Sequence, residues 1–239
     1  MKTLWLVTAR AGSKSIPHKN VRPLAGHPLL AWRIAAARAL SGDDPVWLST
    51  DSPDYAALGE RYGARVPFLR PPELAADDAR SIDVVRHAMA FAEAEGAPAD
   101  ALGLLEPTSP FVQPATLRDA ADRLERTPAA QAIVATRLAR PSTFYIQPEA
   151  ETLAVLAARM TAAGVLRRQD EAAEVTPSGG FYIARWAGLR QGGGFYVEST
   201  LSHRVSEIEG LEIDEPIDWD FAEFLVDSGR VAPPEMPAR

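Results

Sequence analysis

Short apolar segments alternate with longer amphipathic segments through roughly the first half of the chain. The apolar segments have the length of strands, and the amphipathic segments have the spacing of helices. This alternation is typical of βαβ units that form a mostly parallel sheet with helices on both faces. The sequence predicts strands at residues 3–8, 46–49, 66–69, 101–105 and 132–136, and helices near residues 28–40, 54–62, 81–95 and 115–125.

The alternation stops after about residue 137. Prolines and paired glycines then flank the strand-like segment FYIA, a pattern that favours antiparallel strands and long loops around a pocket or an interface. A last helix is expected near residues 217–226, followed by a frayed tail. We therefore predict an α/β protein with one domain over residues 1–228, an inserted subregion near 138–175 and a tail at 229–239.

Composition excludes several classes of protein. The net charge of −7 argues against general nucleic-acid binding, which needs a basic face. The chain has no cysteine, which excludes disulfides, a thiol nucleophile and a cysteine-based metal site. No apolar stretch approaches the ~20 residues that span a bilayer. We expect a soluble cytoplasmic protein with neither a nucleic acid nor a membrane as its partner.

The segment ARAGSKSIPHKN at residues 9–20, called the signature loop below, is basic although the chain is acidic. It follows the first predicted strand, where ligands of open α/β sheets bind. Its basic side chains can hold phosphates through charge-assisted hydrogen bonds, and its glycine allows a close backbone approach. It is not a Walker A loop. From spacing alone, a phosphate site and a plain basic loop are equal alternatives. The residues concerned are Arg10, Gly12, Ser13, Lys14 and Lys19.

Two further polar segments follow predicted strands. In STDSPDYA, helix capping by Asp51 or Ser52 is the favoured interpretation. In RPPELAADDARS, Arg70 stands at a strand end, where it can hold a phosphate or a base edge or form a surface salt bridge. Ser81 is expected to cap the next helix.

Carboxylates follow the central apolar strand and precede the last helix. Glu106 emerges from the strand LGLL into a rigid polar turn. Glu212 and Asp214 alternate on a predicted strand, so they share one face, and such a pair suits Mg²⁺. Asp218 and Asp220 are explained by the positive end of the helix dipole. No histidine has a zinc-ligand spacing, and no G-x-S-x-G elbow occurs.

These segments resemble a known family. The signature loop matches every fixed position of A-R-x-x-S-K-x-x-P-x-K-N, the N-terminal signature of the acylneuraminate cytidylyltransferases, also called CMP-sialic acid synthetases. The similarity continues in order through STDSPDYA, RPPELAADDARS, LLEPTSPF, RRQDEAAEVTPSGGFYI and EIDEPIDWDFAE. It covers about residues 3–225.

The resemblance implies a Rossmann-like nucleotidyltransferase fold and the joining of CTP to a nonulosonic 2-keto sugar acid with Mg²⁺. It also implies a homodimer, formed through the segment near 138–175. By the same resemblance, the triphosphate is held by Arg10, Lys14 and Lys19, with Gly12, Ser13 and Asn20 beside them. The nucleoside lies at Arg70 and Ser81, the sugar at Glu106, Arg168, Ser178, Tyr182, Phe195 and Tyr196, and the metal at Asp214 and Glu212.

Three residues depart from the family pattern. Glu212 stands where an aspartate is expected, so its carboxylate has a longer reach. Glu106 replaces a glutamine and Ser178 an asparagine, which changes groups expected beside the sugar. A cytidylyltransferase for another sugar acid, such as 3-deoxy-manno-octulosonate, and a non-catalytic nucleotide-sugar binding protein are the two alternatives. Joint retention of Lys14, Lys19 and Asp214 argues against the second.

Overall fold

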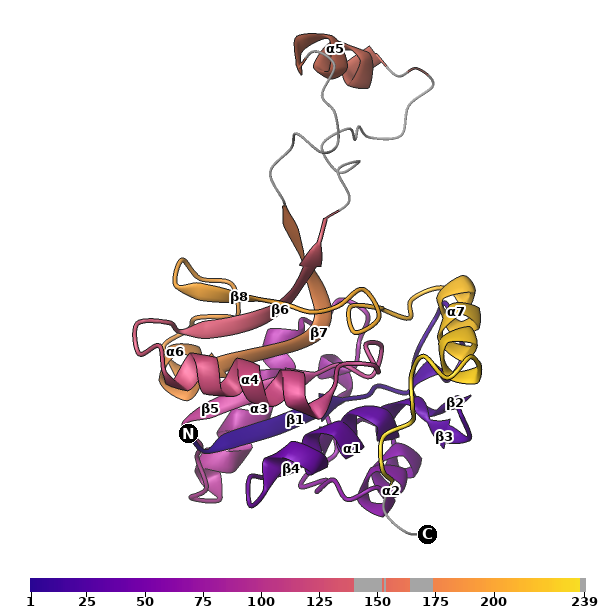
Figure 1. Ribbon diagram of the computed structural model, residues 1–239. Helices are drawn as coiled ribbons and strands as arrows, with labels where there is room; N and C mark the ends of the chain where they lie inside the picture. Colours follow the sequence, from indigo (N-terminus) through magenta and orange to yellow (C-terminus); the bar gives the residue numbers. More distant parts are fainter. Residues whose placement is uncertain (140–151, 153, 164–173, 237–239) are drawn as a thin grey trace.

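The computed structural model describes residues 1–139, 152, 154–163 and 174–236 (Figure 1). Its larger sheet has six strands in the order β4-β1-β5-β7-β6-β8. Among the six, β7 alone runs antiparallel to its neighbours. The strands are β1 (Thr3–Thr8), β4 (Val46–Ser49), β5 (Ala101–Leu105), β6 (Ala132–Leu138), β7 (Val175–Arg185) and β8 (Thr200–Arg204), and β2 (Pro23–Leu24) pairs with β3 (His27–Pro28) in a small hairpin.

Five described helices lie close to their predicted positions, whereas the helices Ala154–Ala163 and Trp186–Arg190 are not predicted from the sequence. Proline stands at the start of α2, α4 and α7, where its missing N–H costs nothing. Ser52 caps α2 by accepting a hydrogen bond from the Tyr55 amide. The helices are α1 (Leu29–Ser41), α2 (Pro53–Arg61), α3 (Ser81–Ala94), α4 (Pro114–Glu125), α5 (Ala154–Ala163), α6 (Trp186–Arg190) and α7 (Pro216–Asp227), with 3-10 turns η1 (Lys19–Val21) and η2 (Pro72–Leu74).

Helices cover both faces of the sheet, and β1 shows why. Its side chains alternate: Trp5 and Val7 pack in a core with α1, α2 and α4, while Leu4 and Leu6 pack in a second core with α3 and α6. Every residue of β5 is buried, as a central strand requires. The predicted α/β fold with a mostly parallel sheet is confirmed.

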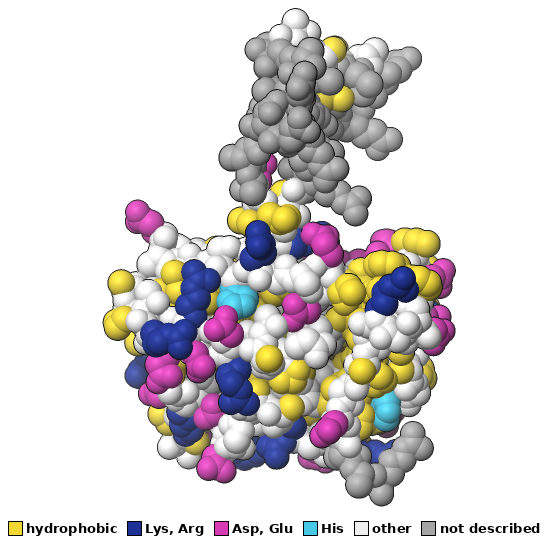
Figure 2. Space-filling model, viewed as in Figure 1, with side chains coloured by type: hydrophobic (Ala, Val, Ile, Leu, Met, Phe, Trp, Pro, Cys, Tyr) yellow, Lys and Arg dark blue, Asp and Glu magenta, His cyan; other side chains and the backbone are white. Residues whose placement is uncertain are grey.

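A third core anchors the C-terminal part of the chain. Trp219 of α7 packs there with Trp32 of α1 and Phe111. The outer face of α7 leaves Ile217, Phe221 and Phe224 exposed, and Figure 2 shows hydrophobic side chains gathered around this helix.

Three predictions about local structure are wrong. Residues 66–69 do not form a ladder strand; only isolated bridges, at Arg65 and Leu69, join this region to the sheet. Ser81 is not a cap, because Arg80 occupies the cap position and makes no side-chain cap bond. The tail is not frayed over its described part, since Val231 is buried and Met236 packs against the third core.

The expected dimerisation subregion lies mostly outside the described residues, although α5 falls within it. In the part of the chain that the structure describes, no helix has the length and apolar character to cross a membrane.

Candidate active site

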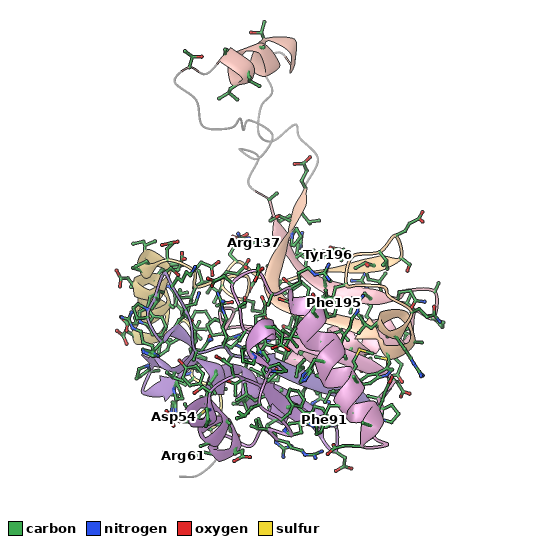
Figure 3. The ribbon with its side chains drawn as sticks, turned by 180° about the vertical axis from the view of Figure 1, so that it is seen from behind. Asp54, Arg61, Phe91, Arg137, Phe195 and Tyr196 are labelled. Carbon is green, nitrogen blue, oxygen red and sulfur yellow. The ribbon has the colours of Figure 1, made fainter. Side chains whose placement is uncertain are left out.

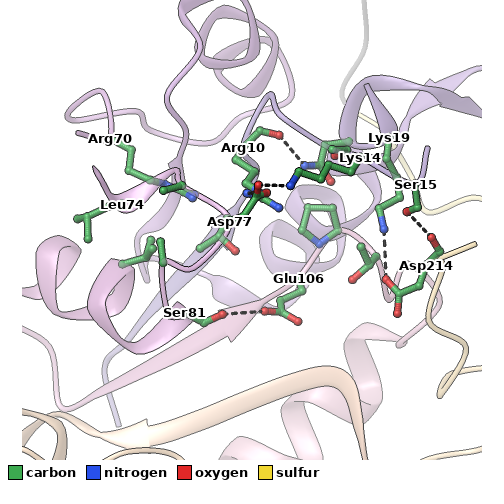
Figure 4. A pocket seen from close by; sticks show the side chains of 18 residues that line it. Arg10, Lys14, Ser15, Lys19, Arg70, Leu74, Asp77, Ser81, Glu106 and Asp214 are labelled. Carbon is green, nitrogen blue, oxygen red and sulfur yellow. Dashed lines mark hydrogen bonds and ion pairs between the residues drawn. The ribbon is translucent and has the colours of Figure 1, made fainter. Parts of the chain in front are cut away.

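A pocket of about 470 Å³ opens where β1 and β5 end, against the N-terminus of α3 (Figure 4). This is the edge of the sheet at which open α/β folds bind ligands. The structure brings together residues that lie far apart in the sequence, from the signature loop to Asp214. Of the predicted site residues, the lining includes Arg10, Ser13, Lys14, Lys19, Asn20, Arg70, Ser81, Glu106 and Asp214.

The signature loop is held in place by its backbone. The Ala11 amide donates to Asp51 Oδ1 at 3.0 Å, and Asn20 Nδ2 donates to the Arg10 carbonyl at 3.0 Å. Gly12 is exposed, with no atom within 4 Å of the place a Cβ would take. Asn20 therefore orders the loop, and Gly12 leaves its backbone open to a ligand.

The basic side chains of the loop fall into two groups. Arg10 and Lys14 both pair with the carboxylate of Asp77, and Arg10 Nη1 lies 2.8 Å from Asp77 Oδ1. Lys19 is 8% exposed and donates to the Ile213 carbonyl at 2.6 Å and to Asp214 Oδ1 at 3.2 Å. Arg10 and Lys14 are thus accessible to solvent, whereas Lys19 is a buried side chain that lines the pocket.

Arg70 is a buried cation at the same pocket. Its guanidinium donates to Ser49 Oγ at 3.0 Å and to the Ser49 carbonyl at 2.5 Å. Burial, together with the charge of Arg10, lowers the pKa of Arg70 to about 10, although Asp51 opposes the shift. The alternative of a surface salt bridge is wrong, because the side chain lies inside the fold.

Glu106 projects from the end of β5 into the opposite side of the pocket. Burial raises its pKa, the hydrogen bond that Ser81 Oγ donates to Oε1 at 3.3 Å lowers it, and the charges of Glu212 and Asp214 raise it again. The charge of Lys19 in turn lowers the pKa, so Glu106 is a half-buried acid near two other acids and one cation.

The predicted sugar-binding aromatics lie beside this acid, outside the residues that line the pocket. The ring of Tyr182 is 5.3 Å from that of Phe195 and 6.2 Å from that of Tyr196. Phe195 and Tyr196 are labelled in Figure 3. Burial raises the pKa of the Tyr182 hydroxyl, and the charge of Glu106 raises it further. Tyr196 is 58% exposed and so offers its ring to a ligand.

Gly179 leaves a small polar cradle next to these rings. A Cβ at this position would lie 2.8 Å from Glu212 Oε2 and 2.9 Å from Ser109 Oγ. The hydroxyls of Ser109 and Ser178 are buried and have no hydrogen-bond partner within the described residues. Buried polar atoms are normally paired, so the Ser109 hydroxyl beside Gly179 marks a place for a polar ligand atom. The Ser178 hydroxyl lies instead on the side of Gly180, with Val112 and Ala135.

Glu212 and Asp214 do not alternate on a strand, as the sequence predicts. Residues 211–214 form a loop, in which the Ile213 amide donates to the Thr108 carbonyl and Ile213 is buried. One such bond anchors a loop but makes no ladder. Asp214 lines the pocket, and Glu212 faces the Gly179 cradle. Within the described ranges, no group of three or more His, Cys, Asp or Glu side chains is placed to hold a metal. Arg168 lies outside the described residues.

Sequence reasoning missed two residues of the site. Asp77 lies inside the motif RPPELAADDARS, but nothing in the motif indicates that it pairs with Arg10 and Lys14. Ser15 Oγ donates to the Asp214 carbonyl at 2.5 Å and so joins the signature loop to the C-terminal motif. Both contacts link distant segments, and spacing along the chain gives no signal for them.

The fold and the cation-lined pocket at the carboxyl edge of its sheet define an α/β protein with a site suited to an anionic ligand. A family model described as cytidylyltransferase matches residues 4–176. The CMP-N,N'-diacetyllegionaminic acid synthase of Legionella pneumophila is 32% identical over 97% of this chain and 99% of that protein. An N-acylneuraminate cytidylyltransferase of Escherichia coli is 30% identical over 92% of this chain, which spans 51% of that relative.

A solved structure titled CMP:2-keto-3-deoxy-manno-octonic acid synthetase complexed with CTP has a similar fold. Its TM-score is 0.71 at 14% identity, over 96% of this chain and all of that one. The chain belongs to the cytidylyltransferase family. It is therefore a nucleotidyltransferase, and the family predicted from the sequence motifs is confirmed.

Proposed function

We propose that the protein joins CTP to a nonulosonic acid, giving a CMP-sugar and pyrophosphate with the help of Mg²⁺. The observation that carries the proposal is the division of the site into a cationic side and an acidic, aromatic side. The named relatives act on N,N'-diacetyllegionaminic acid or N-acylneuraminate, which are sugar acids of this class.

The cationic side suits a triphosphate. Arg10 and Lys14 reach the pocket from a loop with an open backbone, and Lys19 lies below them. Charge-assisted hydrogen bonds from such groups are stronger than neutral ones and match phosphate oxygens. The N-terminus of α3 points to the same pocket through Ser81 and adds a favourable dipole for an anion. The cytidine would lie toward Arg70.

The acidic side suits the sugar. Tyr182 and Tyr196 offer ring faces and hydroxyls, and the buried hydroxyl of Ser109 beside Gly179 has no partner among the described residues. A sugar acid carries many hydroxyl and amide donors, for which carboxylates such as Glu106 are good acceptors.

The residues present fit a magnesium ion. Mg²⁺ usually takes one or two carboxylates and completes its shell with waters and substrate phosphates, so a cluster of three acids is not required. Asp214 is an exposed carboxylate at the pocket and would hold the ion, with Glu212 as the second candidate. When bound, the ion would supply positive charge to the reacting oxygens.

In the proposed reaction, the anomeric 2-hydroxyl of the sugar attacks the α-phosphorus of CTP. One oxygen–phosphorus bond forms, the bond to the β-phosphate breaks, and the hydroxyl proton is released to solvent. Arg10 and Lys14 would hold the leaving pyrophosphate in line, and Lys19 would stabilise charge on the transferred group. Positioning and electrostatic stabilisation dominate such transfers.

We further propose that the protein acts in the cytoplasm as a homodimer. In support, Leu138 and Val175 pair with each other where β6 and β7 lead out of the sheet, and both side chains are exposed. Light scattering on the purified protein measures its mass; a monomer at micromolar concentration would contradict the proposal.

A pyrophosphate-release assay tests the function. CTP, UTP, ATP and GTP are each incubated with sialic, legionaminic, pseudaminic and 3-deoxy-manno-octulosonic acid, with Mg²⁺ or with a chelator. We expect release with CTP, a nonulosonic acid and Mg²⁺ together. Release with 3-deoxy-manno-octulosonic acid and with none of the other three sugar acids would favour the other sugar class. No release with any combination of nucleotide and sugar acid would contradict the proposal.

A further inference from the structure

One carboxylate occupies both solvent-facing cations of the signature loop. Arg10 Nη1 donates to Asp77 Oδ1 at 2.8 Å, and Lys14 Nζ pairs with the other oxygen of the same carboxylate (Figure 4). Arg10 Nη1 also donates to the Ala75 carbonyl at 3.3 Å. In the free protein, therefore, the cations that would bind phosphate are already paired.

The geometry of this carboxylate resembles that of a ligand. Its two oxygens bridge a guanidinium and an ammonium group, as two oxygens of a phosphate chain would. The hydrogen bonds from Lys14 and Arg10 lower the pKa of Asp77, so it is anionic at neutral pH. Asp77 and the phosphates compete for the same two cations.

The pairing is also easy to open. Asp77 lies between η2 and α3. Its side chain is about half exposed, and most of the Lys14 side chain is exposed as well. Such solvent-exposed pairs contribute little free energy. Lys19 differs, because it is buried and bound to a backbone carbonyl.

We propose that Asp77 is an internal competitor that holds Arg10 and Lys14 and weakens the binding of polyphosphates to the pocket. The inference rests on the proposed function and deepens it. A triphosphate or pyrophosphate supplies several anionic oxygens and can take Arg10 and Lys14 together. A nucleoside without phosphates gains nothing by opening the pair. Asp77 therefore raises the dissociation constant of every polyphosphate without affecting the nucleoside.

Calorimetric binding of CTP, inorganic tripolyphosphate and cytidine tests the proposal in the wild-type protein, Asp77→Asn and Asp78→Asn. The neighbouring Asp78 is exposed and does not line the pocket, so Asp78→Asn changes the net charge equally without touching the pair. We expect Asp77→Asn to bind CTP and tripolyphosphate about three- to tenfold tighter, the range expected for two exposed pairs. The affinity of Asp77→Asn for cytidine should equal that of the wild type. Asp78→Asn should bind all three ligands as the wild type does.

The gain should shrink as salt rises from ~0.05 to ~0.5 M, because exposed charges are screened. Equal or weaker polyphosphate binding by Asp77→Asn would overturn the proposal and make Asp77 a group that positions the cations. An equal gain in Asp78→Asn would overturn it in favour of general charge. If tripolyphosphate shows the gain but CTP does not bind, the proposed function fails while the role of Asp77 stands.

Discussion

The two sides of the candidate site differ in how their charges are compensated. On the phosphate side, Arg10, Lys14 and Lys19 each have an acidic partner within the protein. On the sugar side, Glu106 is half-buried near Glu212 and Asp214 and accepts a hydrogen bond from Ser81; it forms no ion pair within the described residues, although the charge of Lys19 lowers its pKa. The buried hydroxyl of Ser109 there has no partner within the described residues.

This difference says what each side must do when substrates bind. A ligand of the phosphate side has to replace the acidic partners of the cations, so it binds only if it carries negative charge itself. A ligand of the sugar side meets groups that burial has already deprived of water, and satisfying them is favourable. On the phosphate side, binding therefore exchanges one anion for another. On the sugar side, binding gives hydrogen-bond partners to buried polar groups.

The largest effect is expected at the buried cation of the phosphate side. Lys19→Ala should lower kcat/KM on the order of 100-fold or more, because an oriented cation is lost from developing phosphate charge. The chain has only three lysines, and Lys2→Ala, far from the pocket, is the matched control. Steady-state kinetics on proteins with native circular dichroism provide the check. Near-normal kcat/KM in Lys19→Ala would remove it from catalysis.

The next prediction separates the two candidate metal ligands. Asp214 lines the pocket, and Glu212 faces the Gly179 cradle. Asp214→Asn should therefore raise the Mg²⁺ concentration for half-maximal activity by more than Glu212→Gln does, with a loss of about 100-fold at saturating Mg²⁺ for a directly stabilising charge. Magnesium titration of both variants tests the order. If Glu212→Gln is the more damaging, the assignment is reversed.

A third prediction concerns the sugar side alone. Glu106→Gln keeps an acceptor but removes the charge, so we expect preference among nonulosonic acids to change by roughly tenfold, as loss of a paired polar contact does. The KM for CTP should stay nearly constant. The measurement is kcat/KM for several sugar acids with wild type and variant in parallel. Equal scaling for every sugar would make Glu106 structural.

The smallest effect is on stability. Because the pKa of Glu106 is raised in the folded protein, its ionised form is less favourable there than in the unfolded chain. Glu106→Gln should raise Tm at pH 7. The gain should decline as pH falls through the raised pKa and vanish below the ordinary value of 4.5, where both states bind the proton. Thermal melts across pH test this, and a gain that persists at pH 3 would contradict it.

The sequence predicts the sheet and most helices because period-two and helical patterns are local. It also predicts which loops meet at the pocket, since parallel strands share one carboxyl edge. It fails at residues 66–69, where only two isolated bridges join the segment to the sheet. It also fails at 211–214, where burial of Ile213 mimics strand alternation in a loop.

The motifs predict which residues lie on the phosphate side, but not the ion pairs that these residues form. Arg10, Lys14 and Lys19 lie at the pocket as expected. That Asp77 and Asp214 pair with them depends on contacts across 63 or more positions, which no local pattern encodes. The sugar side is predicted in part: the grouping of Tyr182, Phe195 and Tyr196 is found, and the roles of all these residues stay predictions.

A crystal structure of the protein with CTP tests the central claim most directly, namely that the signature loop holds the triphosphate. We predict phosphate oxygens within hydrogen-bond distance of Arg10 and Lys14, with the Asp77 carboxylate displaced from both, and the sugar side left open. A triphosphate bound elsewhere, or an Asp77 still paired with both cations beside bound CTP, would contradict the account.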